Sequence, residues 1–454
     1  MFIKKILNYI FVLILLVVIF TLFEMTSFST KYINRAQVTF EINNTKNPQV
    51  KKMLRFMDNV YSLALLKLST KHKSYLNQQD LKYIKMPEEK IISGKKKNFT
   101  VSLPENNFEV GNWHRSHGDN TSSRFSNLKK INLKNVHRLE LAWIYEFDEI
   151  KNDIQANPII AERKIYIPST SKKIISIDAV SGQKIWEHET EGTPARRGLV
   201  YLKESKINKS RIYFCAEKEL ISINPNNGNL IKSFGKNGKV KLKNRCKISP
   251  AIIKDKLIIA TVEPAIEVYD LLEGELLWKF YLKDKKNNEK RNGGKRYDFS
   301  GGNPWGGISA DSKRGIIFIT TGNAGFYFNG VNRPGNNRYS NSVIAIDIFK
   351  KKKLWDFQEV SHDIWNFDIS APPILTSITK DNIKIDVVVA VTKLGNTLIL
   401  DRLTGEPIFD FHKKKAPLSR IPGEKTSYYQ PNLKIPEPFA KQFFNRNEVT
   451  NISN

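Results

Sequence analysis

The residues best suited to chemistry lie between positions 301 and 370 of this 454-residue chain. A run of Gly-Gly-Asn-Pro-Trp-Gly-Gly places Trp305 among small residues, and an aliphatic segment further on leads into Thr-Gly-Asn, which ends at Asn323. A later run, His-Asp-Ile-Trp-Asn-Phe-Asp, contains Asn366 and Asp368. Small residues let a planar ligand approach the backbone and the indole, while amide and carboxylate oxygens can hold a hard cation. The pattern is typical of a site for a quinone and a metal ion.

The elements that must position these residues recur along the chain as a repeat. Each copy has an apolar strand, a turn opened by Asp or Asn, in most copies a glycine four positions on, and an aromatic residue eight positions on. The acidic or amide side chain caps the turn, the glycine takes a positive φ angle, and the ring packs against the neighbouring sheet. In the second copy the aromatic residue, Phe234, is displaced. The copies begin at Asp178, Asn224, Asp270, Asp347 and Asp401.

The spacing of the copies predicts the fold. The first three follow one another at intervals of 46 residues, which is within the range of four-stranded propeller blades. The later intervals are longer because the loops of the candidate site are inserted there. With Trp143 counted as the ring that closes an earlier blade, about six blade signals can be recognised. We therefore predict an all-β protein in which residues 111–454 form a β-propeller of four-stranded blades.

At the candidate site the motifs resemble those of the pyrroloquinoline quinone (PQQ) dehydrogenases, eight-bladed propellers that oxidise alcohols or aldoses outside the cytoplasm. Residues 112–145 are similar to the first part of those propellers, with a Trp, a Gly-Asp pair, an Arg-aromatic-Ser triplet and an Ala-Trp strand. The resemblance implies that Trp305 forms the floor under PQQ and that Asn323 binds calcium or magnesium. It implies that Arg197, in Arg-Gly-Leu-Val-Tyr, pairs with a PQQ carboxylate.

Three further residues are assigned by the same resemblance. Lys393 and Asn396, in Thr-Lys-Leu-Gly-Asn, match a family motif that contacts the quinone oxygens. Glu263 follows an aliphatic strand where the family places an acidic metal ligand. Together with Asn323 and the residue at position 366, it would complete a calcium site built from oxygen ligands.

The chain departs from the family at the residue expected to act as base. The family has Asp directly after Trp in His-Asp-x-Trp-Asp-x-Asp, and this chain has Asn366 there. An amide cannot remove the proton of a substrate hydroxyl. In an extended strand Asp368 would share the face of Asn366, about 7 Å along, so it could serve as a shifted or water-relayed base.

Two hypotheses about function follow. The first is PQQ- and calcium-dependent oxidation of a small alcohol or sugar, with electrons passed to a respiratory quinone or a cytochrome. The second is a catalytically impaired propeller that serves as a scaffold for binding or envelope assembly. No Cys-x-x-Cys-His haem attachment motif is present, so the sequence leaves the acceptor open.

The N-terminal segment predicts the location of the protein. Residues 6–23 are an almost unbroken apolar run of membrane-spanning length that follows Lys4 and Lys5. Bulky residues follow the run, so we expect a retained anchor within residues 1–28 rather than a cleaved signal. Such an anchor implies one inner-membrane span with the bulk of the chain in the periplasm. Residues 29–110 are expected to be a polar spacer with one amphipathic helix at 50–68.

The charge of the chain bears on its binding partners, and its cysteine content bears on disulfide formation. The formal net charge is +28, but the lysines are scattered over predicted turns, so no nucleic-acid partner is expected. Cys215 and Cys246 are the two cysteines of the chain. In an exported protein they could form one disulfide or remain as two buried thiols.

Overall fold

The computed structural model describes residues 87–94, 100–101, 113–147, 157–169, 171–282, 302–325, 335–380, 383–419 and 426–443, with a few single positions besides. The apolar run at 6–23 and the amphipathic helix expected at 50–68 lie outside these residues. Within the described part of the chain, no helix is both long and apolar enough to cross a membrane. Almost all described residues belong to one compact unit, formed by residues 87–419 and 425–454.

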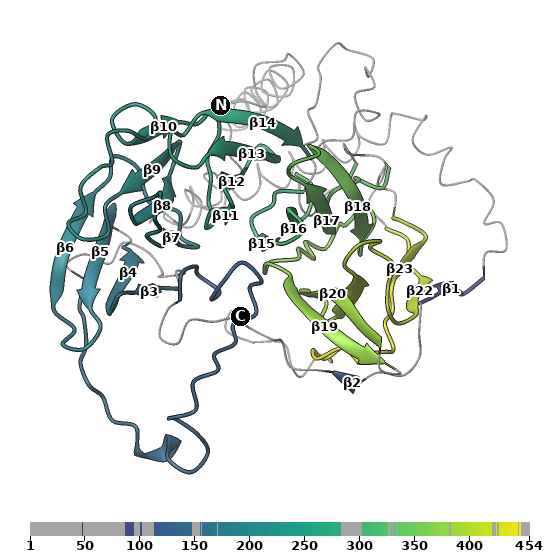
Figure 1. Ribbon diagram of the computed structural model, residues 1–454. Coiled ribbons are helices and arrows are strands. Elements are labelled where there is room, and N and C mark those ends of the chain that lie inside the picture. The colour runs from purple at the N-terminus through teal and green to yellow at the C-terminus, as the bar shows by residue number, and fades with distance from the viewer. Residues whose placement is uncertain are drawn as a thin grey trace, which may run out of the picture. The chain divides into compact units, whose positions relative to one another are not determined.

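Five four-stranded antiparallel sheets follow one another along this unit, which confirms the predicted all-β class (Figure 1). The first contains β3 (Ile159–Ala161), β4 (Lys164–Pro168), β5 (Lys173–Asp178) and β6 (Lys184–Glu189). The second contains β7 (Val200–Leu202), β8 (Arg211–Ala216), β9 (Glu219–Ile223) and β10 (Lys239–Lys241). The third contains β11 (Ala251–Ile253), β12 (Lys256–Thr261), β13 (Ala265–Asp270) and β14 (Leu276–Tyr281).

The remaining strands form two further four-stranded sheets and a smaller one. The fourth sheet contains β15 (Gly307–Asp311), β16 (Ile316–Thr320), β17 (Ser342–Asp347) and β18 (Lys352–Gln358). The fifth joins β19 (Ile374–Lys380), β20 (Ile383–Val391) and β21 (Thr397–Asp401) to the short β2 (Thr100–Val101). A three-stranded sheet combines β1 (Glu89–Ile92), β22 (Phe411–Lys415) and β23 (Tyr429–Pro431).

The sheets are arranged as expected for propeller blades. The first strands of successive sheets contact each other, from β3 to β7, β11, β15 and β19. In Figure 1, β3, β7, β11 and β15 lie on the inner side of their sheets, and β6, β10, β14 and β18 on the outer side. The middle strands β16 and β17 are buried along their whole length, whereas the outer strand β14 is half-buried to exposed. Burial on both faces explains why the middle strands are continuous apolar runs.

Turn glycines of three sheets each lie under an aromatic ring that comes before that sheet in the chain. Gly405 has a φ of +72°, and a Cβ added to it would lie 2.5 Å from the indole of Trp355. The Trp355 Nε1–H donates to the carbonyl of Arg402 in the same turn, at 3.1 Å. Gly182 and Gly228 lie under Trp143 and Trp186 in the same way. This confirms the prediction that the ring of the returning strand packs against the neighbouring sheet.

The second copy of the repeat differs from the expected hairpin. After the turn at Asn224 the chain makes further turns, and β10 pairs with β9 in place of a directly returning strand. Phe234 lies in this irregular stretch and is fully buried. A Cβ added to Gly274 would lie 2.9 Å from its ring. The displaced aromatic residue therefore still covers the turn glycine of the next sheet.

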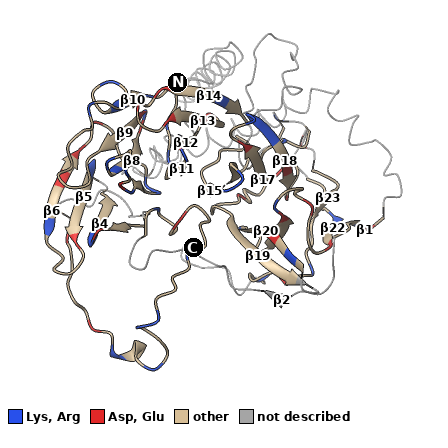
Figure 2. Cartoon of the chain, in the orientation of Figure 1, with Lys and Arg blue, Asp and Glu red and all other residues tan. Residues whose placement is uncertain are grey.

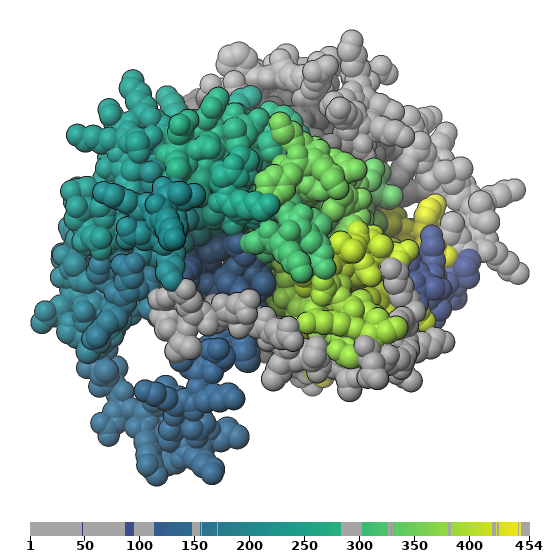
Figure 3. Space-filling model, in the orientation of Figure 1, coloured from purple at the N-terminus to yellow at the C-terminus, as the bar shows by residue number. Residues whose placement is uncertain are grey.

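Residues 113–122, which we call the bridging segment, hold all five sheets together. Figure 3 shows the dark-blue part of the chain between the teal and the yellow-green sheets. Arg115 is buried and donates through Nε to the carbonyl of Pro250 at 2.9 Å and through Nη2 to that of Ile308 at 3.0 Å. Hydrogen bonds of the segment reach, in order along the sheets, Ile160, Tyr201, Pro250, Ala310 and Leu375.

Cys215 of β8 forms a disulfide with Cys246, which precedes β11, so the open question about the two thiols is settled in favour of a bond. The bond links the second sheet to the chain that enters the third. Among the described residues, Lys and Arg are spread over strands and loops of all the sheets (Figure 2).

Candidate functional site

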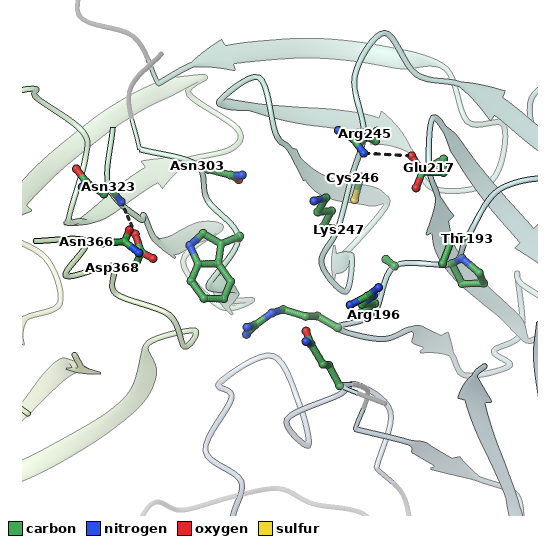
Figure 4. Close-up of a pocket in the computed structure, with 15 residues that line it drawn as sticks. Thr193, Arg196, Glu217, Arg245, Cys246, Lys247, Asn303, Asn323, Asn366 and Asp368 are labelled. Carbon is green, nitrogen blue, oxygen red and sulfur yellow. Dashed lines mark hydrogen bonds and ion pairs between the residues drawn. The ribbon is translucent and has the colours of Figure 1, made fainter. Parts of the chain in front are cut away.

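A cavity of about 540 Å³ lies where the loops of several sheets meet. Figure 4 shows Asn323, Asn366 and Asp368 on one side of it and Arg245 and Lys247 on the other. Trp305 and Arg197 also line the cavity. The candidate site of the sequence and this cavity are therefore the same place.

Two glycines, Gly306 and Gly322, leave room around Trp305 and its neighbours. A Cβ added to Gly322 would lie 2.6 Å from the Trp305 Nε1 atom and 2.6 Å from Asp368 Oδ1. A Cβ added to Gly306 would lie 2.2 Å from the hydroxyl of Thr320. A side chain at Gly322 would clash with the indole, and one at Gly306 would clash with Thr320 and with the backbone of Ile369. The glycines are therefore required for the indole to lie this close to the carboxylate.

Two cations lie over the indole of Trp305. The Arg197 guanidinium carbon is 4.4 Å from the ring centroid and the Lys393 Nζ atom is 5.9 Å from it. The Arg197 Nη1 group also donates to the carbonyl of Ser370 at 3.0 Å, which fixes its orientation. Burial lowers the pKa of Arg197, but a guanidinium stays charged at neutral pH. This end of the cavity therefore combines a flat aromatic surface with positive charge.

Asp368 connects the remaining residues of this end. Its Oδ2 atom forms an ion pair with the Lys393 Nζ atom at 2.8 Å, and its Oδ1 atom accepts the backbone N–H of Asn323. The Lys393 ammonium also donates to the backbone carbonyl of Asn366 at 3.1 Å. These bonds hold three loops together, one after β16, one after β18 and one after β20.

The loop that carries Asn366 is not an extended strand, contrary to the geometry considered from the sequence. Asn366 has a φ of +65°, in the left-handed region that Asn tolerates better than most residues. The buried carboxylate of Asp363 accepts the backbone N–H groups of Trp365 at 2.8 Å and of Phe367 at 2.6 Å. These bonds curl the loop, and both Asn366 and Asp368 line the cavity even so.

The residues singled out in the sequence divide into two groups. Arg197, Trp305, Asn323, Asn366 and Asp368 line the cavity, and Lys393 reaches it through its ion pair with Asp368. Two others lie outside the lining. The Glu263 carboxylate accepts a hydrogen bond from the Asn244 amide, and the Asn396 amide donates to Glu359 at 2.7 Å.

Several lining residues were missed in the sequence. Arg196, Lys247 and Glu217 all face the cavity, as does Cys246 of the disulfide. Glu217 forms a long ion pair of 3.8 Å with Arg245. Arg196 could have been predicted, because it is adjacent to Arg197 in the same loop and both residues line the cavity. For Lys247 and Glu217 no local pattern distinguishes them from surface charges.

The electrostatic character of the cavity is positive. Its lining contains more arginine and lysine side chains than carboxylates, and both carboxylates, Glu217 and Asp368, are in ion pairs. Nearby, burial and the charges of Arg124, Arg115 and Arg197 lower the pKa of His117 to about 3, so its imidazole is neutral at pH 7. Among the described residues, no group of three His, Cys, Asp or Glu side chains could hold a metal ion. The cavity therefore favours a flat anion.

Comparison with known proteins gives a consistent result. Residues 113–454 match the family described as "PQQ: Glucose/ethanol/alcohol dehydrogenase, beta-propeller domain". The chain is 29% identical over 353 residues to the quinoprotein glucose dehydrogenase of Escherichia coli (strain K12), covering 68% of this chain and 44% of that protein. It is 27% identical to the quinate/shikimate dehydrogenase (quinone) of Acinetobacter baylyi, covering 72% and 47%. The chain thus spans about half the length of the relatives it matches.

Solved structures show the same fold. The crystal structure of quinohemoprotein alcohol dehydrogenase from Comamonas testosteroni superimposes with a TM-score of 0.56 at 22% identity, over 72% of this chain and 52% of that one. A second structure, quinohemoprotein alcohol dehydrogenase ADHIIG from Pseudomonas putida HK5, gives a TM-score of 0.58 at 21% identity.

Proposed function

Because this chain belongs to the PQQ dehydrogenase β-propeller family, we propose that it binds PQQ in the cavity and oxidises an alcohol or aldose there. One observation carries the proposal most directly. Trp305, Arg197, Lys393 and Asp368 come from three different sheets or the loops beside them, and they meet at one end of a single cavity. Residues so far apart in the sequence converge at this end of the cavity.

The donor set fits PQQ, which is a planar tricarboxylate. The indole of Trp305 offers a flat aromatic surface, and Arg197 and Lys393 place positive charge over it. Arg196, Arg197 and Lys247 supply cations for carboxylates, and a guanidinium can hold a carboxylate through two parallel hydrogen bonds. Cavity shape and charge therefore agree with the cofactor that the resemblance implies.

The fit to calcium or magnesium is poorer. Asn323, Asn366 and Asp368 provide one carboxylate and two amides at the cavity. The carboxylate already accepts bonds from Lys393 and from the Asn323 backbone. Calcium usually takes about six to eight oxygen ligands, and each lost carboxylate weakens its binding. We propose that a divalent cation is held weakly by these residues.

In the proposed oxidation, each residue of the site would have a separate role. Bound PQQ would supply a two-electron acceptor for the substrate hydride. Asp368 would accept the hydroxyl proton, because Asn366 cannot and Glu217 lies on the side of Arg245. Lys393 would hold the Asp368 carboxylate in place through its 2.8 Å ion pair. Arg197 would orient the cofactor by its charge.

Two further elements of the proposal concern location and partners. We propose that residues 6–23 anchor the chain in the inner membrane with the cavity in the periplasm. The Cys215–Cys246 disulfide supports this location, because such bonds persist in oxidising compartments. A membrane quinone or a cytochrome would then receive the electrons.

PQQ titration of the full chain tests the binding step. Saturable quenching of tryptophan fluorescence is expected, followed by reduction of an artificial electron acceptor when calcium and an alcohol or aldose panel are added. Absence of any saturable change would overturn the proposal.

Variants of Arg197 locate the binding site. Arg197→Ala is expected to weaken PQQ binding by roughly 1.5–3 kcal/mol, the usual range for hydrogen bonds to charged groups. Arg197→Lys should recover only part of this loss, because an ammonium cannot make the bidentate contact. The exposed Lys206→Ala serves as control and should bind like the wild type. Equal affinity in all three variants would place PQQ elsewhere.

A second candidate function is binding without turnover. It is favoured by the amide at position 366 and by the single carboxylate at the metal position. A scaffold of this kind would give no electron transfer with any substrate of the panel, whether or not PQQ binds. The two functions therefore differ in the acceptor assay.

A further inference from the structure

A fully buried carboxylate lies behind the cavity, and the proposed chemistry does not use it. Glu359 follows β18 directly and has 1% of its surface exposed. Its Oε1 atom accepts the Thr392 hydroxyl at 3.0 Å and the Asn396 side-chain amide at 2.7 Å. Its Oε2 atom has no hydrogen-bond partner among the described residues.

The two donors are the ends of the turn that carries Lys393. This turn joins β20 to β21, and its backbone closes through Thr392 N–H to Asn396 O at 3.1 Å and Gly395 N–H to Thr392 O at 3.0 Å. One carboxylate oxygen of Glu359 therefore binds both ends of the turn. The Lys393 side chain of the same turn reaches the Asp368 carboxylate and the Trp305 ring.

The backbone of Glu359 is tied to the other loops of the site. The Glu359 backbone N–H donates to the carbonyl of Asn341 at 2.9 Å. The Asn341 amide donates to the Asp363 carboxylate and to the Phe367 carbonyl, both at 2.8 Å. The Asn341 backbone N–H donates to the carbonyl of Gly322, next to Asn323, at 2.9 Å. Glu359 thus sits at the junction of the loops that carry Asn323, Asn366 and Lys393.

We propose that Glu359 is a positioning residue that clamps the 392–396 turn so that the Lys393 ammonium faces Asp368 and Trp305. The inference rests on the proposed function, because Lys393 matters only if the cavity holds its anionic cofactor. Burying a carboxyl group with two neutral donors and one unpartnered oxygen is costly, and an apolar side chain would serve packing alone better. The two bonds to the turn are what a leucine in this position could not make.

The protonation state of Glu359 suggests the matched variant. Burial raises the pKa of Glu359 to about 7, and the nearby negative charge of Asp363 adds to the effect. A neutral carboxyl has the same shape as the glutamine amide. Glu359→Gln therefore keeps the acceptor oxygen for Thr392 and Asn396, whereas Glu359→Leu removes it at similar volume.

Lysine reactivity in the cofactor-free full chain tests the clamp directly. The acylation rate of Lys393 by an amine-reactive ester, followed by mass spectrometry, is expected to rise several-fold in Glu359→Leu and to return toward the wild-type rate in Glu359→Gln. Lys206, exposed and remote in sequence, serves as the internal reference. An unchanged Lys393 rate in Glu359→Leu, or an equal rise at both lysines, would overturn the proposal.

A double-mutant cycle then tests whether the clamp acts through Lys393. Glu359→Leu should weaken PQQ binding in the wild-type background and have no further effect when Lys393→Met is already present. Additive losses would show that Glu359 acts by another route and would contradict the inference. If the wild type binds no PQQ, the proposed function fails, while the lysine reactivities still decide whether Glu359 positions Lys393.

Discussion

At the scale of single residues, the site combines cationic groups and an aromatic ring with an amide at position 366, where the resemblance to the family implies a carboxylate. The Trp305 indole, the Arg197 guanidinium and the Lys393–Asp368 ion pair lie together at one end of the cavity. Asn366 stands beside them with an amide that cannot accept a proton. In the proposed reaction, turnover depends on whether Asp368 can take the role of the base.

The first prediction restores a carboxylate at position 366. Asn366→Asp is expected to raise kcat with the artificial acceptor by about 10²-fold or more, since a positioned base contributes about 10²–10⁴-fold. Asp tolerates the φ of +65° at this position, so the loop should keep its shape. Asp368→Asn is the companion variant and should abolish the residual turnover. A wild-type rate that survives Asp368→Asn would rule out Asp368 as the base.

At the scale of elements, much of the fold could be predicted from spacing. The turns at Asp178, Asp270, Asp347 and Asp401 were located correctly, because capping residue, glycine and aromatic ring act within a few positions of one another. The pairing of β10 with β9 could not be predicted, because the displaced Phe234 reaches the neighbouring sheet from an irregular loop. The contact of Phe234 depends on the structure of the neighbouring sheet, so it produces no periodic pattern in the sequence.

The second prediction concerns the turn glycines. Gly405→Ala is expected to lower the free energy of unfolding by about 2 kcal/mol or more, because the left-handed conformation and the contact with Trp355 each cost about 1–2 kcal/mol. Gly335 is the matched control, since its φ is +86° and no atom lies within 4 Å of a Cβ added there. Thermal unfolding of both variants checks this. Equal melting temperatures would contradict the role assigned to the ring.

A buried ion-pair network links the fourth and fifth sheets. Asp311 at the end of β15 binds Arg314 at 2.6 Å and Arg402 at 3.2 Å. Burial alone would raise the pKa of Asp311, but the hydrogen bonds and charges of the two arginines outweigh it, and the pKa is lowered. A group with a depressed folded pKa stabilises the protein above its unfolded pKa, about 3.9, and loses this effect as the pH falls through the folded value.

The third prediction follows from the lowered pKa of Asp311. Asp311→Asn is expected to lower the free energy of unfolding by about 1.5–3 kcal/mol at pH 7, the range for hydrogen bonds to charged groups. The difference from the wild type should shrink once the pH falls below about 4. Urea unfolding at a series of pH values measures it. The exposed pair of Asp255 with Lys256 supplies the control, because Asp255→Asn should have little effect at any pH. A difference that is constant across pH would contradict the prediction.

At the scale of the whole molecule, the sequence predicted correctly which residues lie at one cavity. It did not predict the direct contacts that each of these residues makes. Trp305, Arg197, Lys393 and Asn323 were placed together by their motifs, and the structure brings them to one cavity. Their neighbours were not predictable, because those contacts depend on loops far apart in the sequence. Glu263 shows the difficulty: its strand was located correctly, yet the turn after it directs the carboxylate to Asn244.

The fourth prediction concerns the disulfide, which joins two sheets and lines the cavity. Replacing Cys215 and Cys246 together by alanine is expected to lower the free energy of unfolding by about 3–4 kcal/mol, as for loops of this length. Affinity for PQQ should fall as well, because Cys246 lies in the cavity wall. Unfolding of the oxidised and the reduced wild type should show the same loss of stability. Unchanged stability after reduction would show that the bond constrains nothing.

The bridging segment also determines when the domain can be finished during synthesis. Residues 113–122 leave the ribosome before any of their hydrogen-bond partners in the five sheets, and their last partner, Leu375, is made some 250 residues later. Contacts between such distant parts of a chain form slowly. The hydrogen bonds of the bridging segment can therefore be completed only after β19 of the fifth sheet has emerged.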